Sequence, residues 1–293
     1  NSRNFKGFSL RINFFPNSTS KFNAMSNNHH KNPNTFLPVL LAFCFLSGCD
    51  YHQDSVFLGR MEAGLLGYVN NGNIRKVKDF LDKGGNVNLQ DEPGMTPLHH
   101  AVNSDWKESH LGMIKLLIEK GANVNAIDDI HHTPLHMASN ATVAGLLIDA
   151  GADVNAKTKR EGETLLFSAA WGAAQGASKS HQMYLDLTKL LLAKGADLNV
   201  KLREGSMIKD EKPYRFKSGD TVLHKVARSY SEKHASEICE LLVGSGSNVN
   251  ELNVKGQTPL DEALANERNQ TAQTLLKLGA IKGKVIAIDS DDQ

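Results

Sequence analysis

Gly-Ala-Asn-Val-Asn at residues 121–125 and Thr-Pro-Leu-His at residues 133–136 are the two phrases that decide the fold, because both recur along the chain. Close or shortened copies of the first phrase stand at 84–88, 151–155, 195–199 and 247–250. Variants of the second phrase begin at Thr96, Thr164, Thr221 and Thr258. Self-similarity of this kind is typical of proteins that stack one structural unit many times. The sequence therefore predicts a repeat protein.

Each phrase has a mechanical reason. A Thr hydroxyl can cap free backbone N–H groups, and Pro fits the first helical position, where no donor is needed. The apolar runs 113–120 and 188–194 have helical spacing and stop at Gly121 and Gly195, which can adopt the left-handed conformation that ends a helix. Short polar stretches such as 126–132 then suit a turn or a hairpin, called a finger below. The predicted unit is helix, turn, helix and finger.

This alternation resembles the ankyrin repeat. The resemblance implies an all-α solenoid of about six helix-turn-helix units with β-hairpin fingers, spanning residues 62–283. Residues 62–88 are expected to form a first unit without the Thr-Pro phrase, and residues 258–279 the last unit. One unit cannot bury its own apolar face, so neighbouring units stabilise each other. Residues 284–293 are expected to be a short tail.

Two departures from regular spacing mark the middle of the repeat region. The asparagine that closes the first phrase lies 8 or 9 residues before the next Thr in four fingers, but Asn199 lies 22 residues before Thr221. One finger is thus predicted to be 14 residues too long. Asn199 follows Thr164 by 35 residues, against about 25 in an undecorated unit of this family. The fourth unit is therefore expected to carry about ten extra residues between its helices.

The N-terminal region differs in composition from the repeats, because residues 1–48 hold five basic residues and no Asp or Glu. Residues 1–24 show no helical or strand period and are expected to be absent from the mature protein. After Met25, a polar stretch precedes the apolar run 36–46, and this order predicts a secretory signal over residues 25–48. The run of about 11 residues is too short for a membrane-spanning helix, which needs roughly 20.

Leu-Ser-Gly-Cys at residues 46–49 resembles the lipobox of bacterial lipoproteins, in which the Cys is acylated and becomes the first residue. By this resemblance Cys49 is the lipid anchor, and residues 49–61 hold the anchor and a tether. The protein would then lie in the bacterial cell envelope and face the periplasm, and Asp50 favours the inner membrane. More than one acyl chain gives stable anchoring. The alternative is a buried core segment with an incidental Cys49.

Composition excludes several function classes. The chain has 33 Lys and Arg against 32 Asp and Glu, so no nucleic-acid partner is expected. With Cys44 removed and Cys49 acylated, Cys239 has no partner for an internal disulfide. Cys239 is expected to be a small core side chain rather than a catalytic thiol. No phosphate loop or nucleophile motif is present in the sequence, so neither an enzyme nor a cofactor is predicted.

The long finger, residues 201–217, is the first candidate for partner contact. It has six basic residues against three acidic ones, with aromatic residues between them. Aromatic and Arg side chains are enriched at binding hot spots, and long loops in compact folds are often functional. The expected contact residues are Arg203, Lys212, Tyr214, Arg215 and Phe216. The alternative is a solvated insertion without function.

The first helix of each unit offers a second set of contacts. Ankyrin proteins present on their concave face the position after the Thr-Pro-Leu-His phrase and another position one turn later. By the resemblance, the expected contacts are His100, Met137, Trp171, Lys225 and Arg228, and the equivalent positions elsewhere are Asn103, Asn140, Ser168 and Glu262. This mixed chemistry suits a protein partner, which the sequence does not name. The expected function is a monomeric protein-binding module, which could inhibit its partner by covering it, as an immunity protein does.

A rival hypothesis is metal or small-ligand binding by the histidines of the second and third repeats, because His99, His100, His131, His132 and His136 could converge. Against this, His99, His136 and His224 stand where ankyrin histidines link neighbouring loops by hydrogen bonds. No acidic or Cys residue lies beside them at a recognisable metal spacing. Protein binding without a metal is therefore the leading prediction.

Overall fold

The computed structural model describes four stretches of the chain, residues 64–104, 108–176, 178–203 and 219–283. The expectations for the signal segment, for Cys49, for the tether and for the tail lie outside the described residues. Two compact units divide the described chain, and residues 78–86 belong to a different unit from residues 65–77 and 87–283. The larger unit carries the features discussed below. None of the helices in the described stretches is long and apolar enough to span a bilayer.

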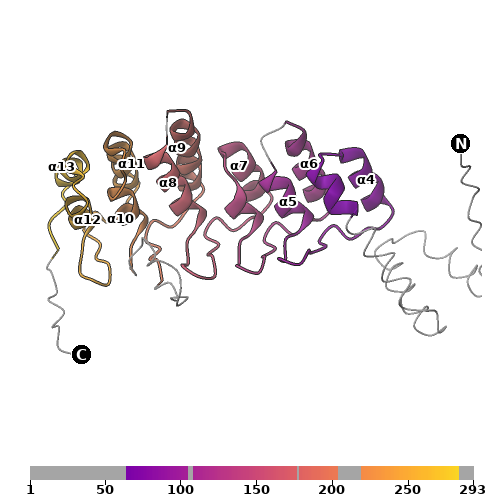
Figure 1. Cartoon of the computed structure of the whole chain (residues 1–293), viewed down its shortest axis with the longest axis horizontal. Coiled ribbons are helices and arrows are strands. Elements are labelled where there is room, and N and C mark those ends of the chain that lie inside the picture. Colours follow the sequence, from indigo (N-terminus) through magenta and orange to yellow (C-terminus); the bar gives the residue numbers. More distant parts are fainter. Residues whose placement is uncertain (1–63, 105–107, 177, 204–218, 284–293) are drawn as a thin grey trace, which may run out of the picture. The chain divides into compact units, whose positions relative to one another are not determined.

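The helices come in pairs, as the repeated phrases predicted (Figure 1). The pairs are α5 (Pro97–Asn103) with α6 (Glu108–Glu119), the 3₁₀ helix η2 (Pro134–Met137) with α7 (Ala141–Asp149), α8 (Leu165–Gln175) with α9 (Ser178–Ala193), α10 (Val222–Ala227) with α11 (Glu232–Gly244), and α12 (Pro259–Ala265) with α13 (Asn269–Lys277). A helix over residues 64–70 precedes α4 (Ile74–Asp82). The all-α ankyrin solenoid with about six helical units is confirmed.

Within the larger unit the helices form two layers. The first helices contact one another along the stack, as α5 does with η2 and as α10 does with α8 and α12. The second helices do the same, as the α7–α9 and α11–α13 contacts show. Leucines of both layers, such as Leu98, Leu147, Leu191 and Leu223, are fully buried between them. Each unit thus buries its apolar face against its neighbours.

Cys239 lies in α11 and is fully buried, as the sequence predicted. Burial, with a smaller contribution from Glu240, raises the pKa of the Cys239 thiol to about 12. A thiol in this environment stays protonated and unreactive near neutral pH.

The helix ends show the predicted chemistry. The Thr96 hydroxyl oxygen accepts from the His99 N–H, and Pro97 occupies the first turn of α5. At the other end of the unit, Gly121 adopts the left-handed conformation with φ 84°. There the Gly121 N–H donates to the Ile118 carbonyl at 3.0 Å, which closes the last turn of α6.

The fingers are the first (89–95), the second (126–132), the third (156–163), the long finger and the last (251–257). With its base, the long finger extends from the predicted 201–217 to 200–220. The first finger is closed by the Asp91 N–H donating to the Met95 carbonyl at 3.1 Å. The described residues contain no strand, so the fingers are tight hairpin loops rather than the expected β-hairpins. Two or three residues on each side of a turn are too few for a regular ladder.

The third and fourth units explain the irregular spacing. In the third unit, η2 has only 4 residues where α5 has 7, so the unit is short. In the fourth unit the expected insertion between the helices is wrong, because α8 has 11 residues and α9 has 16, with only residues 176–177 between them. The helices themselves are longer. Buried alanines, which favour helix, extend α8, and they are Ala169, Ala170, Ala173 and Ala174.

Candidate binding surface of the first helices and fingers

Neighbouring fingers are tied together through their backbones. The Asp129 N–H of the second finger donates to the Pro93 carbonyl of the first at 3.1 Å. The Lys159 N–H of the third finger donates to Ile130 at 3.1 Å, and the Arg203 N–H of the long finger donates to the Glu161 carbonyl at 2.8 Å. Side chains on these fingers are therefore held at fixed positions relative to one another.

The Thr-x-x-His phrase supplies a histidine in three units. We call these residues, His99, His136 and His224, the loop histidines, because their phrase directly follows a finger. The Thr96 N–H donates to Nδ1 of His99 at 3.1 Å, so the proton of the neutral ring lies on Nε2, which donates to the His132 carbonyl at 3.0 Å. His224 reaches the Gln257 carbonyl in the same way, at 3.0 Å.

Burial is the main cause that lowers the pKa of each loop histidine. The rings are therefore neutral at physiological pH. The expected links between neighbouring loops are confirmed for His99 and His224.

The asparagine that closes each first phrase forms a second series of links, which the sequence analysis did not foresee. Asn125 donates from Nδ2 to the Gly151 carbonyl at 3.0 Å, and its Oδ1 accepts from the Asp153 N–H at 2.8 Å. Equivalent bridges start from Asn88, Asn155 and Asn250. The sequence does contain a signal for these links. The same Asn closes every copy of the first phrase, and the Gly whose carbonyl accepts its hydrogen bond stands one unit later.

The base of the long finger matches that of the regular last finger. The Leu202 N–H donates to the Asp220 carbonyl at 2.9 Å, as the Asn253 N–H does to Gln257 at 3.0 Å. Gly219 has φ 79° and Gly256 has φ 68°, so the same turn residue closes both. The extra residues therefore enter between Arg203 and Gly219, at the tip of an otherwise regular finger.

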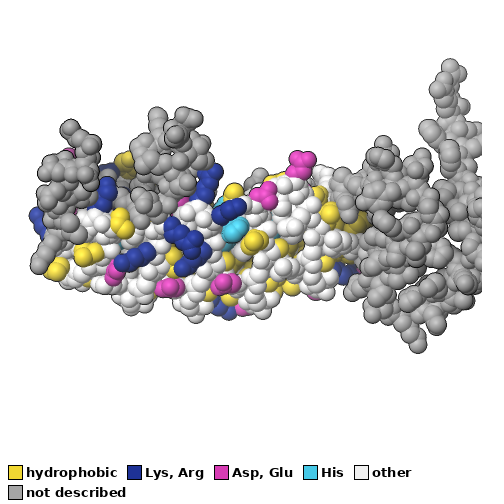
Figure 2. Space-filling view, turned by 90° about the horizontal axis from the view of Figure 1, so that it is seen from below, with side chains coloured by type: hydrophobic (Ala, Val, Ile, Leu, Met, Phe, Trp, Pro, Cys, Tyr) yellow, Lys and Arg dark blue, Asp and Glu magenta, His cyan; other side chains and the backbone are white. Residues whose placement is uncertain are grey.

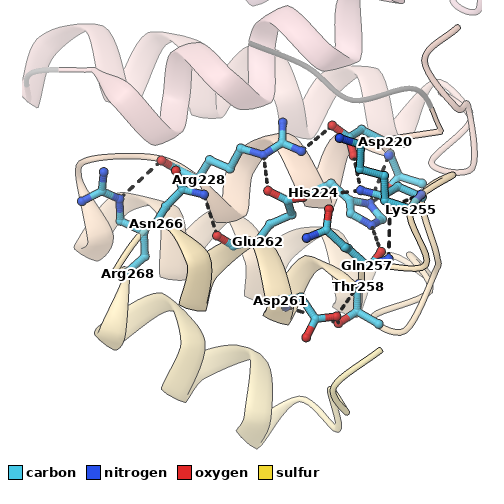
Figure 3. Close-up of polar contacts among 12 residues, drawn as sticks. Asp220, His224, Arg228, Lys255, Gln257, Thr258, Asp261, Glu262, Asn266 and Arg268 are labelled. Carbon is cyan, nitrogen blue, oxygen red and sulfur yellow. Dashed lines mark hydrogen bonds and ion pairs between the residues drawn. The ribbon is translucent and has the colours of Figure 1, made fainter. Parts of the chain in front are cut away.

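A buried charge network fixes this base to the last two repeats (Figure 3). The Arg228 Nε donates to Glu262 at 2.7 Å, and its guanidinium also pairs with Asp220. The Nδ2 of Asn253 donates to the second oxygen of Asp220 at 3.0 Å. Burial opposes the Arg228 charge, but the carboxylates of Glu262 and Asp220 outweigh it and raise the pKa of Arg228. The Asp220 end of the finger is thus clamped from two units.

A second ion pair lies on the first helices. Lys225 is buried, and its Nζ lies 2.5 Å from Glu163 of the third finger. The same ammonium lies 5.8 Å from the ring centre of Phe167 and 6.0 Å from that of Trp171. Cation–π attraction at such distances adds to the ion pair. Trp171, beside this pair, is partly exposed.

The predicted contact residues fall into three groups. Tyr214, Phe216, Lys212 and Arg215 lie outside the described residues. Arg203 is exposed, and Met137, Trp171 and His100 are partly exposed, with His100 Nε2 2.7 Å from Asp91. The charges of Lys225 and Arg228 are engaged by internal carboxylates. A role in binding stays a prediction for all of these residues.

Exposed apolar residues on the fingers were missed by the sequence reasoning. Ile127 and Ile130 of the second finger are 47% and 46% exposed, and Leu252 and Val254 of the last finger are 46% and 63% exposed. Exposed apolar side chains that gather into a patch are typical of protein-binding sites. The sequence signal was an apolar residue on both sides of the finger turn in an otherwise polar loop.

The histidines of the second and third repeats do not gather into a site. Across the described stretches, no group of three or more His, Cys, Asp or Glu residues could hold a metal ion. His99 points into its loop contacts, while His132 stacks on His136 with ring centres 5.5 Å apart. This geometry gives no support to the metal hypothesis.

The paired helices, the Thr residues that cap the first helices and the hydrogen bonds between fingers define a repeat solenoid, a class of fold that binds other proteins. The sequence profile for ankyrin repeats in three copies matches residues 65–158 and 176–285. The chain therefore belongs to the ankyrin repeat family, whose members are protein–protein interaction scaffolds and are generally not enzymes. No curated protein sequence matches the chain.

Solved structures share the fold. An ankyrin repeat domain from Acinetobacter baumannii is 24% identical with TM-score 0.59, and the match covers 75% of this chain and 100% of that one. A second ankyrin repeat protein is 22% identical with TM-score 0.56, covering 73% and 96%. A complex of a predatory endopeptidase from Bdellovibrio bacteriovorus with an immunity protein contains a chain that is 30% identical with TM-score 0.49, again covering 73% and 96%.

Proposed function

We propose that the protein is a lipid-anchored scaffold of the bacterial cell envelope that binds a partner protein on its fingers and first helices. The observation that carries the binding proposal is the exposure of Ile127 and Ile130 on a finger whose backbone is bonded to both neighbouring fingers, with further exposed apolar side chains at Leu252 and Val254 of the last finger. Apolar side chains held this way bind without much loss of conformational entropy.

The long finger would extend this surface. Its sequence offers Tyr214, Phe216, Arg215 and Lys212, and the Asp220 clamp provides a firm base for whatever they contact. A partner that meets both the finger edge and Trp171 would be covered over a wide area. If the covered area includes an active site, binding inhibits the partner.

The anchor is proposed from the Leu-Ser-Gly-Cys sequence that ends at Cys49. A diacylated or triacylated Cys49 would hold the repeats beside the periplasmic face of a membrane. Asp50 favours the inner membrane. A scaffold fixed there meets partners that are membrane-bound or newly exported.

The test is affinity capture from crosslinked membranes with three forms of the full chain. One is unchanged, one lacks residues 205–218, and one carries Lys233→Glu and Lys277→Glu on the exposed side of the second helices. Removal of residues 205–218 brings Gly219 next to Glu204 and leaves a finger of the same length as the last finger, so the repeat stack is preserved.

We expect the unchanged and Lys233/Lys277 forms to retain one stoichiometric partner and the shortened form to lose it. Equal capture by the shortened form would remove the long finger from the binding site. Absence of a specific partner from all three forms would refute protein binding as the function.

A further inference from the structure

The finger row reverses its charge along the chain. The exposed charged residues of the first two fingers include the acidic Glu92 and Asp129. Among the described residues of the next two fingers the exposed charges are basic, and four of them form what we call the basic finger patch, defined as Lys157, Lys159, Arg160 and Arg203. Figure 2, which views the fingers end on, shows Lys and Arg side chains gathered near the middle of this face.

Nearby carboxylates leave this patch positive. Glu163 forms an ion pair with the buried Lys225 at 2.5 Å. Lys201 is not counted in the patch, because it forms an ion pair with Glu251 at 2.5 Å. Glu161 is the remaining carboxylate of the third finger, and it is half-buried. Within the described part of the second, third and long fingers, the four cations of the patch outnumber the two remaining carboxylates that reach solvent, Glu161 and Asp129. The field over the patch attracts a negative partner.

The patch is held in place by its backbone. Arg203 is fixed by the 2.8 Å bond from its N–H to the Glu161 carbonyl, and its side chain runs past Gly162, where a Cβ would lie 3.6 Å from the Arg203 Cγ. Lys159 is fixed by its 3.1 Å bond to Ile130. Cations on linked loops keep their relative spacing and can match a patterned partner.

Apolar side chains adjoin the patch and decide between possible partners. The bond from Lys159 to Ile130 places the second finger directly beside the third, and Ile127 and Ile130 are nearly half exposed there. Phosphates of nucleic acids and of lipid headgroups would pair with the cations but make no apolar contact with the two isoleucines, and the tied finger backbones hold these isoleucines beside the patch. A protein segment with both carboxylates and apolar side chains uses the whole surface.

We infer that the second and third fingers, together with Arg203, form a docking surface for an acidic protein segment that also presents apolar side chains to Ile127 and Ile130. This inference rests on the proposed binding function and names the chemistry of the partner. The acidic exposed residues of the first two fingers then disfavour the reversed orientation of the same segment. Attraction at the patch and contact at the isoleucines together set the direction in which the partner lies.

The probe is a fluorescent synthetic peptide in which Asp and Glu alternate with Leu, measured by anisotropy at physiological salt. A peptide with Ser in place of Leu, poly(U) RNA and phosphatidylglycerol vesicles serve as the other ligands. Lys159→Glu/Arg160→Glu removes the centre of the patch, and Lys233→Glu/Lys277→Glu makes the same charge change away from the fingers. We expect the patch variant to weaken peptide binding by on the order of tenfold or more, and the control by less than about twofold.

Equal weakening by the two variants would overturn the inference, because net charge alone would then explain binding. Binding of the Ser peptide, RNA or vesicles as tightly as the Leu peptide would also overturn it, because the isoleucines would play no part. In the membrane capture experiment, retention of the partner by Lys159→Glu/Arg160→Glu would refute this docking surface and leave the proposed function standing. Loss of the partner from Lys159→Glu/Arg160→Glu, with retention by Lys233→Glu/Lys277→Glu, is the result that supports it.

Discussion

Arg228 is the residue whose removal tests the structure most severely. Arg228→Met keeps much of the aliphatic stem but leaves Asp220 and Glu262, which are 0% and 1% exposed, without their cation. Removing one partner of a buried ion pair costs about 3–5 kcal/mol, because the remaining charge stays desolvated. Asn253 still donates to Asp220 at 3.0 Å and offsets part of the loss. We therefore expect a destabilisation near the lower end, about 3 kcal/mol.

The matched control removes the charges together. Asp220→Asn/Arg228→Met/Glu262→Gln leaves no buried charge, and replacement of whole buried ion networks by neutral groups is often nearly neutral. We expect the triple variant to recover most of the stability that Arg228→Met loses, to within about 1–2 kcal/mol of the unchanged protein.

The assay is urea unfolding followed by circular dichroism, with hydrogen exchange to locate the change. Because repeat stability is a sum over neighbouring units, loss of protection should concentrate in α10 and α12 rather than in α5. A loss below about 1 kcal/mol for Arg228→Met, or a triple variant less stable than Arg228→Met, would refute the reasoning, because buried carboxylates would then not depend on the guanidinium.

Three further predictions follow from single features. Burial lowers the pKa of the loop histidines below 6.5, so the unfolded chain binds more protons than the folded one. The free energy of unfolding should therefore be highest above pH 6.5 and fall as the pH drops below it. A melting temperature that is flat from pH 7.5 to 5 would contradict this. Gly219→Ala should lower the free energy of unfolding in urea by about 1–3 kcal/mol, because φ is 79° and a Cβ would lie 2.8 Å from the Val254 nitrogen. Gly244→Ala, which has open space around it, should instead raise that free energy by roughly 0.5 kcal/mol. Cys49→Ala should abolish metabolic labelling with palmitate and release the protein from membranes, while Cys44→Ala should leave both unchanged; continued labelling of the first variant would refute the anchor.

Much of the fold could be predicted from the sequence because local chemistry and stacking agree. Thr96 and Pro97 cap a helix for reasons that act within one turn, and Gly121 ends one for reasons that act on its own φ. Asn155 follows Thr133 by only 22 residues, and η2 shows that a 3₁₀ turn replaces the first helix of this third unit. Local rules are sufficient where the next unit repeats the same geometry.

The misses arise where helix length or pairing depends on distant residues. The extra residues near Trp171 were expected in a loop, but buried alanines continue α8 instead. Gly172 packs closely against Tyr184, since a Cβ at this position would lie 2.8 Å from the ring. This close approach makes room for the longer α9. Lys225 was selected as a surface residue by register. Its buried pair with Glu163 spans 62 positions in sequence, which no local pattern reveals.

Exposure on the fingers also escaped the sequence. Residues 126–132 were interpreted as a polar finger, yet the loop holds Ile130 46% exposed beside Lys159. The long finger was predicted as an insertion of 14 residues, and the match between Gly219 and Gly256 shows where the insertion enters. Its contact residues Tyr214 and Phe216 lie outside the described residues and stay predictions.

Site-specific photocrosslinking in membranes tests the central claim most directly. One form of the protein carries the photoreactive residue in place of Ile130 on the second finger, and the other carries it in place of Leu276 on α13, which is 54% exposed. We expect one discrete crosslinked partner protein from position 130 and none from position 276. No crosslink from position 130, or the same product from both positions, would contradict a protein-binding finger surface.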